Sequence, residues 1–89
     1  MTVEVNGRVK WQSRRGMREL DLMLLPFVNE DLGNMDEQIL SDYEDLLLAT
    51  DLELVRWFNG TAVPDSERRV RIVKLIKDCH AKRMGREGV

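Results

Sequence analysis

The sequence predicts an all-α fold, a small bundle of five helices in a single domain. Three observations support this prediction. Apolar residues recur three and four positions apart along most of the chain, and capping residues or glycines separate these stretches. No stretch of useful length alternates apolar and polar residues, as a half-buried strand would. We therefore expect one helical domain over residues 1–89, with flexible tails at 1–7 and 85–89.

The first two helices are expected on either side of Gly16. The first covers residues 8–15, and its large apolar residues are Val9 and Trp11. Gly16 ends it, because glycine readily takes the left-handed conformation that follows a helix. The second helix, residues 17–32, should be the most buried, and Pro26, which lacks an N–H, should kink or break it. Its apolar stripe consists of Met17, Leu20, Leu24, Phe27 and Val28, widened by Leu22, Met23 and Leu25.

The third and fourth helices each follow a capping-box pattern, in which a capping residue precedes a glutamate by three positions. Asn34 and Glu37 have this spacing at the start of the third helix, which we expect over residues 36–49. Thr50 and Glu53 repeat it before the fourth helix. The fourth helix is short, because turn residues follow it closely.

A turn at Gly60 separates the fourth helix from the fifth. Pro64 and Asp65 open the fifth helix, and its apolar face consists of Ile72, Val73, Ile76 and Cys79. We expect this helix to end before Gly85. Large aromatic residues at helical spacing usually pack inside a protein, so we assign Phe27, Tyr43, Trp57 and Phe58 to the core or its edge.

The net charge of −2 conceals three blocks of opposite sign. Residues 1–20 carry a net charge of +3, residues 21–67 carry −11 and residues 68–89 carry +6. Such blocks can neutralise one another within the fold, and they can also steer a charged partner. Because the chain is acidic overall, we expect no nucleic acid among its partners.

No apolar run reaches the roughly 18 residues that a membrane-spanning helix needs, and the first residues lack the pattern of a signal peptide. We therefore expect no direct membrane insertion and a cytoplasmic location. The single cysteine, Cys79, cannot form an internal disulfide, which fits a reducing compartment.

The sequence offers no convergent set of catalytic or metal-binding residues. Cys79 and His80 are neighbours, so on a helix their side chains point about 100° apart and cannot easily meet at one metal or act as nucleophile and base. Gly16 has no second glycine at the spacing of a phosphate loop, and the acidic residues lack the spacing of a calcium loop. We expect no catalytic residue, no metal and no stably bound cofactor.

The most distinctive stretch of the sequence is Arg14–Leu20, in which three arginines and one glutamate surround Gly16. One interpretation is a helix end between two solvated faces, since a glycine just past a helix is common. The other is a contact site for a partner, because a glycine also lets a foreign backbone approach closely. Spacing alone does not separate these interpretations.

Four elements follow one another along the chain: Trp11, the stretch Arg14–Leu20 with its Arg-Gly-Met-Arg-Glu centre, Leu25-Pro26-Phe27, and Asp51–Phe58 with Trp57. Together they resemble the succinate dehydrogenase assembly factor 2 (flavinator) family, of the bacterial FAD assembly factor type, over about residues 8–80. The resemblance implies an assembly chaperone that binds the flavoprotein subunit of succinate dehydrogenase, and of the related fumarate reductase, and promotes covalent FAD attachment. It also implies that FAD and the attachment chemistry belong to the client flavoprotein, so the factor is not itself an enzyme.

The same resemblance directs attention to the charged glycine stretch as the contact with the flavoprotein. The expected partner-binding residues are Trp11, Arg14, Arg15, Gly16, Met17, Arg18 and Glu19. Gly16 would permit close approach, while the charged residues beside it would form charge-assisted hydrogen bonds. Trp11 is as consistent with the core as with the interface.

We expect the free protein to be a monomer. A helical protein-interaction module of the antitoxin type is the alternative function for such a chain. The two functions differ in one measurable respect, because a flavinylation factor changes the covalent flavin content of a client and an antitoxin does not.

Overall fold

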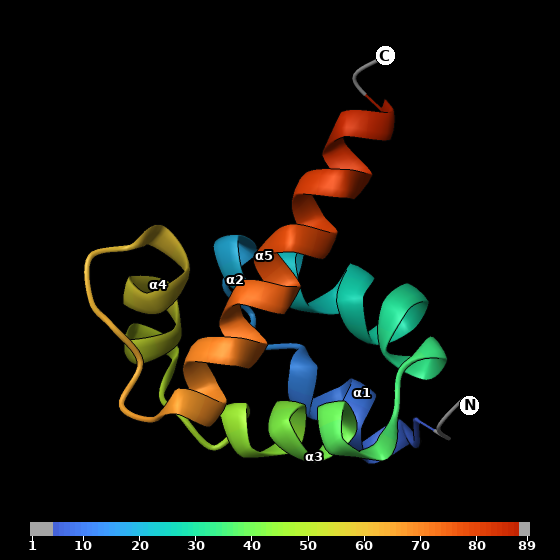
Figure 1. Ribbon diagram of the computed structural model, residues 1–89, viewed down its shortest axis with the longest axis horizontal. Coiled ribbons are helices and arrows are strands. Elements are labelled where there is room, and N and C mark those ends of the chain that lie inside the picture. The colour runs from blue at the N-terminus through green and yellow to red at the C-terminus, as the bar shows by residue number, and fades with distance from the viewer. Residues whose placement is uncertain (1–4, 88–89) are drawn as a thin grey trace.

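The computed structural model describes residues 5–87, which form five α-helices and two short irregular helical turns (Figure 1). The α-helices are α1 (Gly7–Ser13), α2 (Arg18–Pro26), α3 (Glu37–Leu46), α4 (Asp51–Asn59) and α5 (Glu67–Glu87). Between α2 and α3 lie the π-helix η1 (Phe27–Asp31) and the 3₁₀-helix η2 (Leu32–Asn34). None of residues 5–87 forms a strand. The predicted all-α, five-helix fold is confirmed.

Side chains and a glycine fix several helix ends. The side chain of Asn6 accepts a hydrogen bond from the Val9 N–H (3.0 Å) at the start of α1. The predicted capping box of Thr50 and Glu53 is present at the start of α4, with both reciprocal hydrogen bonds formed. Gly60 ends α4 in the left-handed conformation (φ 81°), as expected for a glycine after a helix.

The predicted cap of α3 at Asn34 is wrong by two residues. Asp36 caps this helix, and its carboxylate accepts a hydrogen bond from the Ile39 N–H (3.0 Å). Asn34 instead belongs to η2, and its side-chain amide donates to the Glu30 carbonyl. Two good capping residues stand close together here, and the aspartate has the extended backbone that a cap requires.

Pro26 changes the helix without breaking it. α2 ends at this residue, and the chain continues as the π-helix η1, in which the Leu32 N–H donates to the Phe27 carbonyl five residues earlier. A proline cannot donate to the carbonyl four residues back, so the hydrogen-bond register is free to widen here. The predicted disturbance at Pro26 therefore takes the form of a π turn.

α2 and η1 form the centre of the bundle, with α1, α4 and α5 packed against them and α3 packed against α5 (Figure 1). The buried apolar core includes Val9, Leu20, Leu24, Phe27, Val28, Leu32, Tyr43, Leu46, Leu54, Trp57, Ile72, Val73 and Ile76. The assignment of four aromatic residues to the core or its edge is confirmed. Phe27, Tyr43 and Trp57 are buried, and Phe58 is half-buried. One expectation was wrong, since Leu22 is 54% exposed. Trp11, which the sequence left open between core and interface, is 77% exposed.

The predicted end of the last helix is also wrong, because α5 passes through Gly85 and reaches Glu87. Arg83 explains why the helix persists so far: its side chain is mostly buried and forms an ion pair with Asp31 of η1 (3.0 Å). This anchor holds the chain two residues before the glycine, so the modest cost of a glycine inside a helix does not end it. Of the predicted N-terminal tail, Asn6 and Gly7 instead cap and begin α1, while residues 1–4 and 88–89 lie outside the described residues.

The acidic and basic blocks partly neutralise each other inside the fold. Arg68 on α5 contacts the buried Asp42 of α3 (2.6 Å), and Arg69 contacts Asp45 (3.0 Å). Arg69 also lies over the Trp57 ring, 5.8 Å from its centre. These contacts join α3, α4 and α5, so part of the charge pattern serves the fold itself.

One buried hydrogen bond joins α1 to α3. The hydroxyl groups of Ser13 and Tyr43 lie 2.6 Å apart, and the Ser13 hydroxyl also donates to the Val9 carbonyl (2.8 Å). Both side chains are fully buried. Burial raises the pKa of Tyr43 to about 12, because the phenolate would lose its hydration there.

We expect Tyr43→Phe to lower the free energy of unfolding by about 1 kcal/mol at pH 7, since Ser13 keeps its bond to the Val9 carbonyl. The unfolded tyrosine ionises near pH 10 and the folded one near 12, so the unfolded state binds fewer protons between these values. Wild-type stability should therefore fall there, by up to about 1.4 kcal/mol per pH unit, relative to the variant. Urea unfolding of both proteins from pH 7 to 12 measures this difference, and parallel curves would contradict the buried phenol.

Candidate functional site

The charged glycine stretch forms the connection between α1 and α2 and the first turn of α2. α1 ends at Ser13 with the extended Arg14 as its C-cap, so the prediction that Gly16 ends this helix is wrong, and Met17 is the N-cap of α2. Gly16 between them has φ 81°, a left-handed conformation that other residues adopt only with strain. A Cβ atom added to Gly16 would meet no other atom within 4 Å. Glycine is thus required here by the backbone, and the space beside it is open.

Arg15 holds this connection against a distant part of the chain. Its guanidinium donates to Asp51 at the start of α4 (2.8 Å) and to the carbonyls of Leu47 (3.2 Å) and Ala49 (2.6 Å). Its backbone N–H donates to the carboxylate of Asp21, in the first turn of α2 (3.0 Å). The side chain is only 15% exposed. We call this set of bonds the Arg15 clamp.

The clamp divides the predicted partner-binding residues into two groups. Arg15 bonds within the protein, and Met17 packs, half-buried, against the core. The other five residues are exposed: Trp11, Arg14, Gly16, Arg18 and Glu19. The structure therefore brings the glycine and the charges of Arg14, Arg18 and Glu19 together at one outward turn, with Trp11 exposed on the preceding helix.

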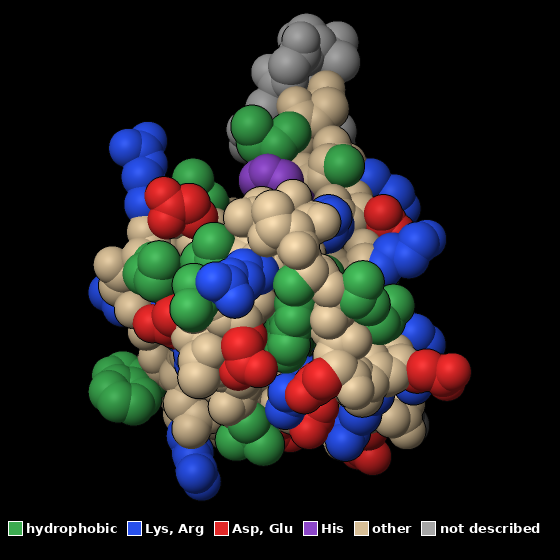
Figure 2. Space-filling view, turned by 90° about the vertical axis from the view of Figure 1, so that its left-hand side faces the viewer, with side chains coloured by type: hydrophobic (Ala, Val, Ile, Leu, Met, Phe, Trp, Pro, Cys, Tyr) green, Lys and Arg blue, Asp and Glu red, His purple; other side chains and the backbone are tan. Residues whose placement is uncertain are grey.

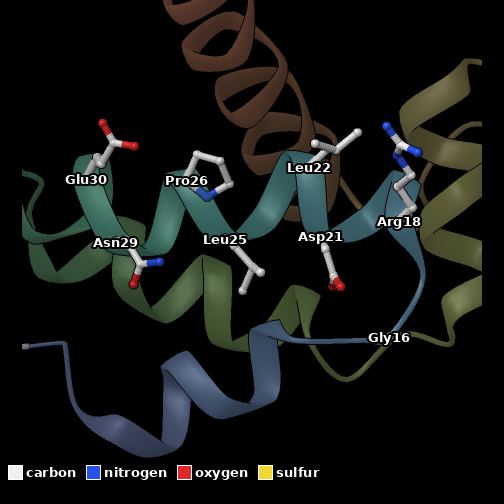
Figure 3. Close-up of a pocket in the computed structure, with 8 residues that line it drawn as sticks. All are labelled: Gly16, Arg18, Asp21, Leu22, Leu25, Pro26, Asn29 and Glu30. Atoms are coloured by element: carbon white, nitrogen blue, oxygen red, sulfur yellow. The ribbon is translucent and has the colours of Figure 1, made fainter.

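A groove of about 590 Å³ begins at this turn and follows the outer face of α2 and η1 (Figure 3). Its lining residues are Gly16, Arg18, Asp21, Leu22, Leu25, Pro26, Asn29 and Glu30. The sequence did not predict this groove, since Leu22 and Leu25 were assigned to the buried stripe by their apolar character. Strict helical spacing excludes Leu22 from that stripe, because it lies about 200° around the helix from both Leu20 and Leu24.

A second, smaller groove of about 230 Å³ lies on the other side of the turn, between α2 and α4. Glu19 and Met23 line it from α2, and Val55 and Phe58 line it from α4. In Figure 2, which faces the side that carries α4, hydrophobic side chains reach the surface between charged ones. Arg18 and Glu19, adjacent in sequence, therefore line two different apolar grooves.

The thiol of Cys79 is half-buried on α5, and its burial raises its pKa. A raised pKa lowers the thiolate fraction, which is the reactive and metal-binding form of cysteine. Within the part of the chain that the structure describes, no three histidine, cysteine or acidic side chains group as metal ligands. No described helix is both long and apolar enough to cross a membrane.

The fold and the outward turn define a small all-α protein with a rigidly held charged glycine connection. A family model described as "Flavinator of succinate dehydrogenase" matches residues 7–80, and the chain belongs to this family.

Curated relatives agree with this assignment. The chain is 31% identical over 78 residues to the FAD assembly factor SdhE of Photorhabdus laumondii, covering 88% of this chain and 89% of that one. It is 36% identical over 73 residues to the SdhE of Legionella pneumophila strain Paris, covering 82% and 91%. It is 37% identical over 71 residues to the SdhE of Pseudomonas aeruginosa, covering 80% and 84%. The resemblance first seen in the motifs is confirmed.

We expect Arg15→Ala to lower the free energy of unfolding by about 2 to 3 kcal/mol, because it removes charge-assisted hydrogen bonds to Asp51 and to three backbone carbonyls. The neighbouring exposed Arg14→Ala is the matched control and should change stability by no more than about 0.5 kcal/mol. Urea unfolding checks both values. Equal stability of the two variants would show that the clamp contributes nothing to the fold.

Proposed function

We propose that this protein binds the flavoprotein subunit of succinate dehydrogenase and promotes covalent attachment of FAD to it. The observation that carries this proposal is the outward turn, in which Gly16, Arg18 and Glu19 are exposed while Arg15 is used to hold them. As a helix end alone, the stretch would present hydrated charges around an open glycine; a client that binds them gives the exposed arrangement a function. The family to which the chain belongs, described as flavinator of succinate dehydrogenase, supports succinate dehydrogenase as the source of the client.

The factor would act by binding and not by bond-making. If the client flavoprotein rarely visits the arrangement in which FAD attaches, preferential binding of that arrangement increases its population. A differential affinity of about 3 kcal/mol corresponds to roughly a 150-fold increase. FAD and the attachment chemistry stay with the client, so the factor needs no cofactor of its own.

We extend the proposal in two ways. The flavoprotein of fumarate reductase is a second client, and the factor acts as a monomer in the cytoplasm.

Each residue of the turn has a distinct part in this proposal. Arg18 and Glu19 contact the client by charge-assisted hydrogen bonds, since both are exposed at the start of α2. Gly16 supplies a left-handed bend with open space, which lets a client backbone come close. Arg15 acts through the other residues, as a positioning residue that fixes the turn before the client arrives. A preformed turn avoids an ordering cost on binding.

We expect Glu19→Ala to unfold within about 0.5 kcal/mol of the wild type, as exposed substitutions do, and to lose most client flavinylation. Glu44→Ala, at an exposed glutamate of α3, is the matched control and should keep full activity. The assay co-expresses each variant with the flavoprotein, denatures the client and measures its flavin fluorescence in a gel. Full activity of folded Glu19→Ala would remove this residue from the contact, and a client unaffected by the wild-type factor would refute the proposed function.

Gly16→Arg tests the same turn by bulk, and the chain contains a close control. Gly60 has the same φ of 81° and the same open surroundings as Gly16, but it lies at the end of α4. Gly16→Arg and Gly60→Arg should therefore each cost about 1 kcal/mol of stability from backbone strain. Only Gly16→Arg should abolish flavinylation. If both variants lose activity in proportion to their unfolding, the turn is part of the scaffold and not a contact site.

A further inference from the structure

The groove along α2 and η1 extends the candidate site well beyond the glycine turn. Figure 3 shows its side chains in two rows, with Arg18, Leu22, Pro26 and Glu30 on one side of the helix and Asp21, Leu25 and Asn29 on the other. Both rows have a spacing of four residues. In a regular α-helix a four-residue spacing drifts by about 40° per step, so such a row would soon leave one face.

The π-helix acts on the last step of each row, because η1 begins only after Pro26. A π turn holds more residues than an α turn, so each residue rotates less about the axis, and the step from Pro26 to Glu30 offsets part of the drift accumulated along α2. Asn29 and Glu30 both belong to η1, which starts directly after Pro26. The change of register at Pro26 therefore keeps Glu30 on the face that Arg18 begins. π turns are rare, and they occur frequently at functional sites.

The middle of the groove is apolar. Leu22 is 54% exposed, and the half-buried Leu25 and Pro26 lie beside it.

The two ends present opposite exposed charges, since Arg18 and Glu30 are both exposed and line the groove twelve residues apart. Asp21 also lines the Arg18 end, but it is half-buried and its carboxylate accepts a hydrogen bond from the Arg15 backbone N–H (3.0 Å). Within the described residues neither Arg18 nor Glu30 forms an ion pair. Twelve residues of helix span about 18 Å.

We propose that this groove binds one segment of the client flavoprotein in a single direction, with apolar side chains over Leu22 and Leu25, a carboxylate at Arg18 and a cation at Glu30. This inference rests on the proposed function and adds the chemistry of the client segment to it. Charge complementarity fixes the direction, because a reversed segment would place like charges together at both ends. Gly16 and Arg18 belong to both the groove and the turn, so one client would contact the groove and the turn through a single continuous surface.

The apolar part of the proposal is tested with Leu22→Ser, measuring the affinity of the purified factor for the purified flavoprotein. We expect the dissociation constant to rise about tenfold. Leu52→Ser is the matched control, because Leu52 is a leucine of α4 with a similar exposure of 59% and lies outside the groove. Equal binding by Leu22→Ser and wild type, with binding lost in Glu19→Ala, would overturn the inference and leave the proposed function intact.

The charged ends are tested with Arg18→Glu and Glu30→Lys. Each should weaken binding at least tenfold, and each should reduce the loss of affinity that added salt causes. Glu44→Lys reverses an exposed charge on α3 and should leave affinity unchanged. Unchanged affinity in Glu30→Lys would remove the far end of the groove from the interface.

The direction is tested by placing a photoreactive amino acid at position 18 or position 30 and identifying the crosslinked client peptide. Both positions should label the same client segment, position 18 beside an acidic residue and position 30 beside a basic one. Labelling in the opposite order, or on separate segments, would overturn the proposal.

A second copy of this chain, packed antiparallel, would also pair Arg18 with Glu30. A wild-type dimer that Leu22→Ser dissociates would therefore assign the groove to self-association instead. If the wild-type factor binds no flavoprotein, the proposed function itself fails.

Discussion

The outward turn depends on one interaction, the hydrogen bonds of the Arg15 guanidinium with the connection between α3 and α4. The carbonyls of Leu47 and Ala49 lie where α3 ends, so they have no partner from the helix itself. Arg15 satisfies them, and Asp51 neutralises its charge. A planar, multivalent donor suits this task, since it can bond several acceptors at once without shifting. The result is a short connection that is bonded both to the first turn of α2 and to the connection between α3 and α4.

The clamp also accounts for how the charged residues around Gly16 are distributed. With Arg15 turned inward and Met17 against the core, the backbone between them must bend sharply, and the left-handed Gly16 makes that bend. Arg18 and Glu19 then begin α2 with their side chains outside the core. The structural and functional interpretations of the motif are thus complementary. One arginine stabilises the fold, and its neighbours are left exposed because of it.

Sequence patterns predicted the parts of the fold that depend on near neighbours. Helical spacing identified the five helices, and the capping motif at Thr50 and the glycine at Gly60 marked the ends of α4. Patterns were less successful where distant residues compete. Nothing local shows that Arg15 bonds carbonyls more than thirty residues away, or that Arg83 extends α5 by contacting Asp31. Long side chains reach partners that spacing cannot identify.

The groove at the candidate site was missed for a different reason, because Leu22 was assigned to the stripe by its apolar character and not by its spacing. Leu22 lies two residues from both Leu20 and Leu24, about 200° around α2, so it lies opposite the buried stripe, and it is exposed because no helix covers that side. Pro26 was recognised as a disturbance, but its consequence, a π turn that aligns the groove, depends on how the chain restores its hydrogen bonds afterwards. An uncovered apolar row beside a rigid charged turn is costly to leave in water. Its burial by a partner would therefore add affinity beside the charges that we propose to orient that partner.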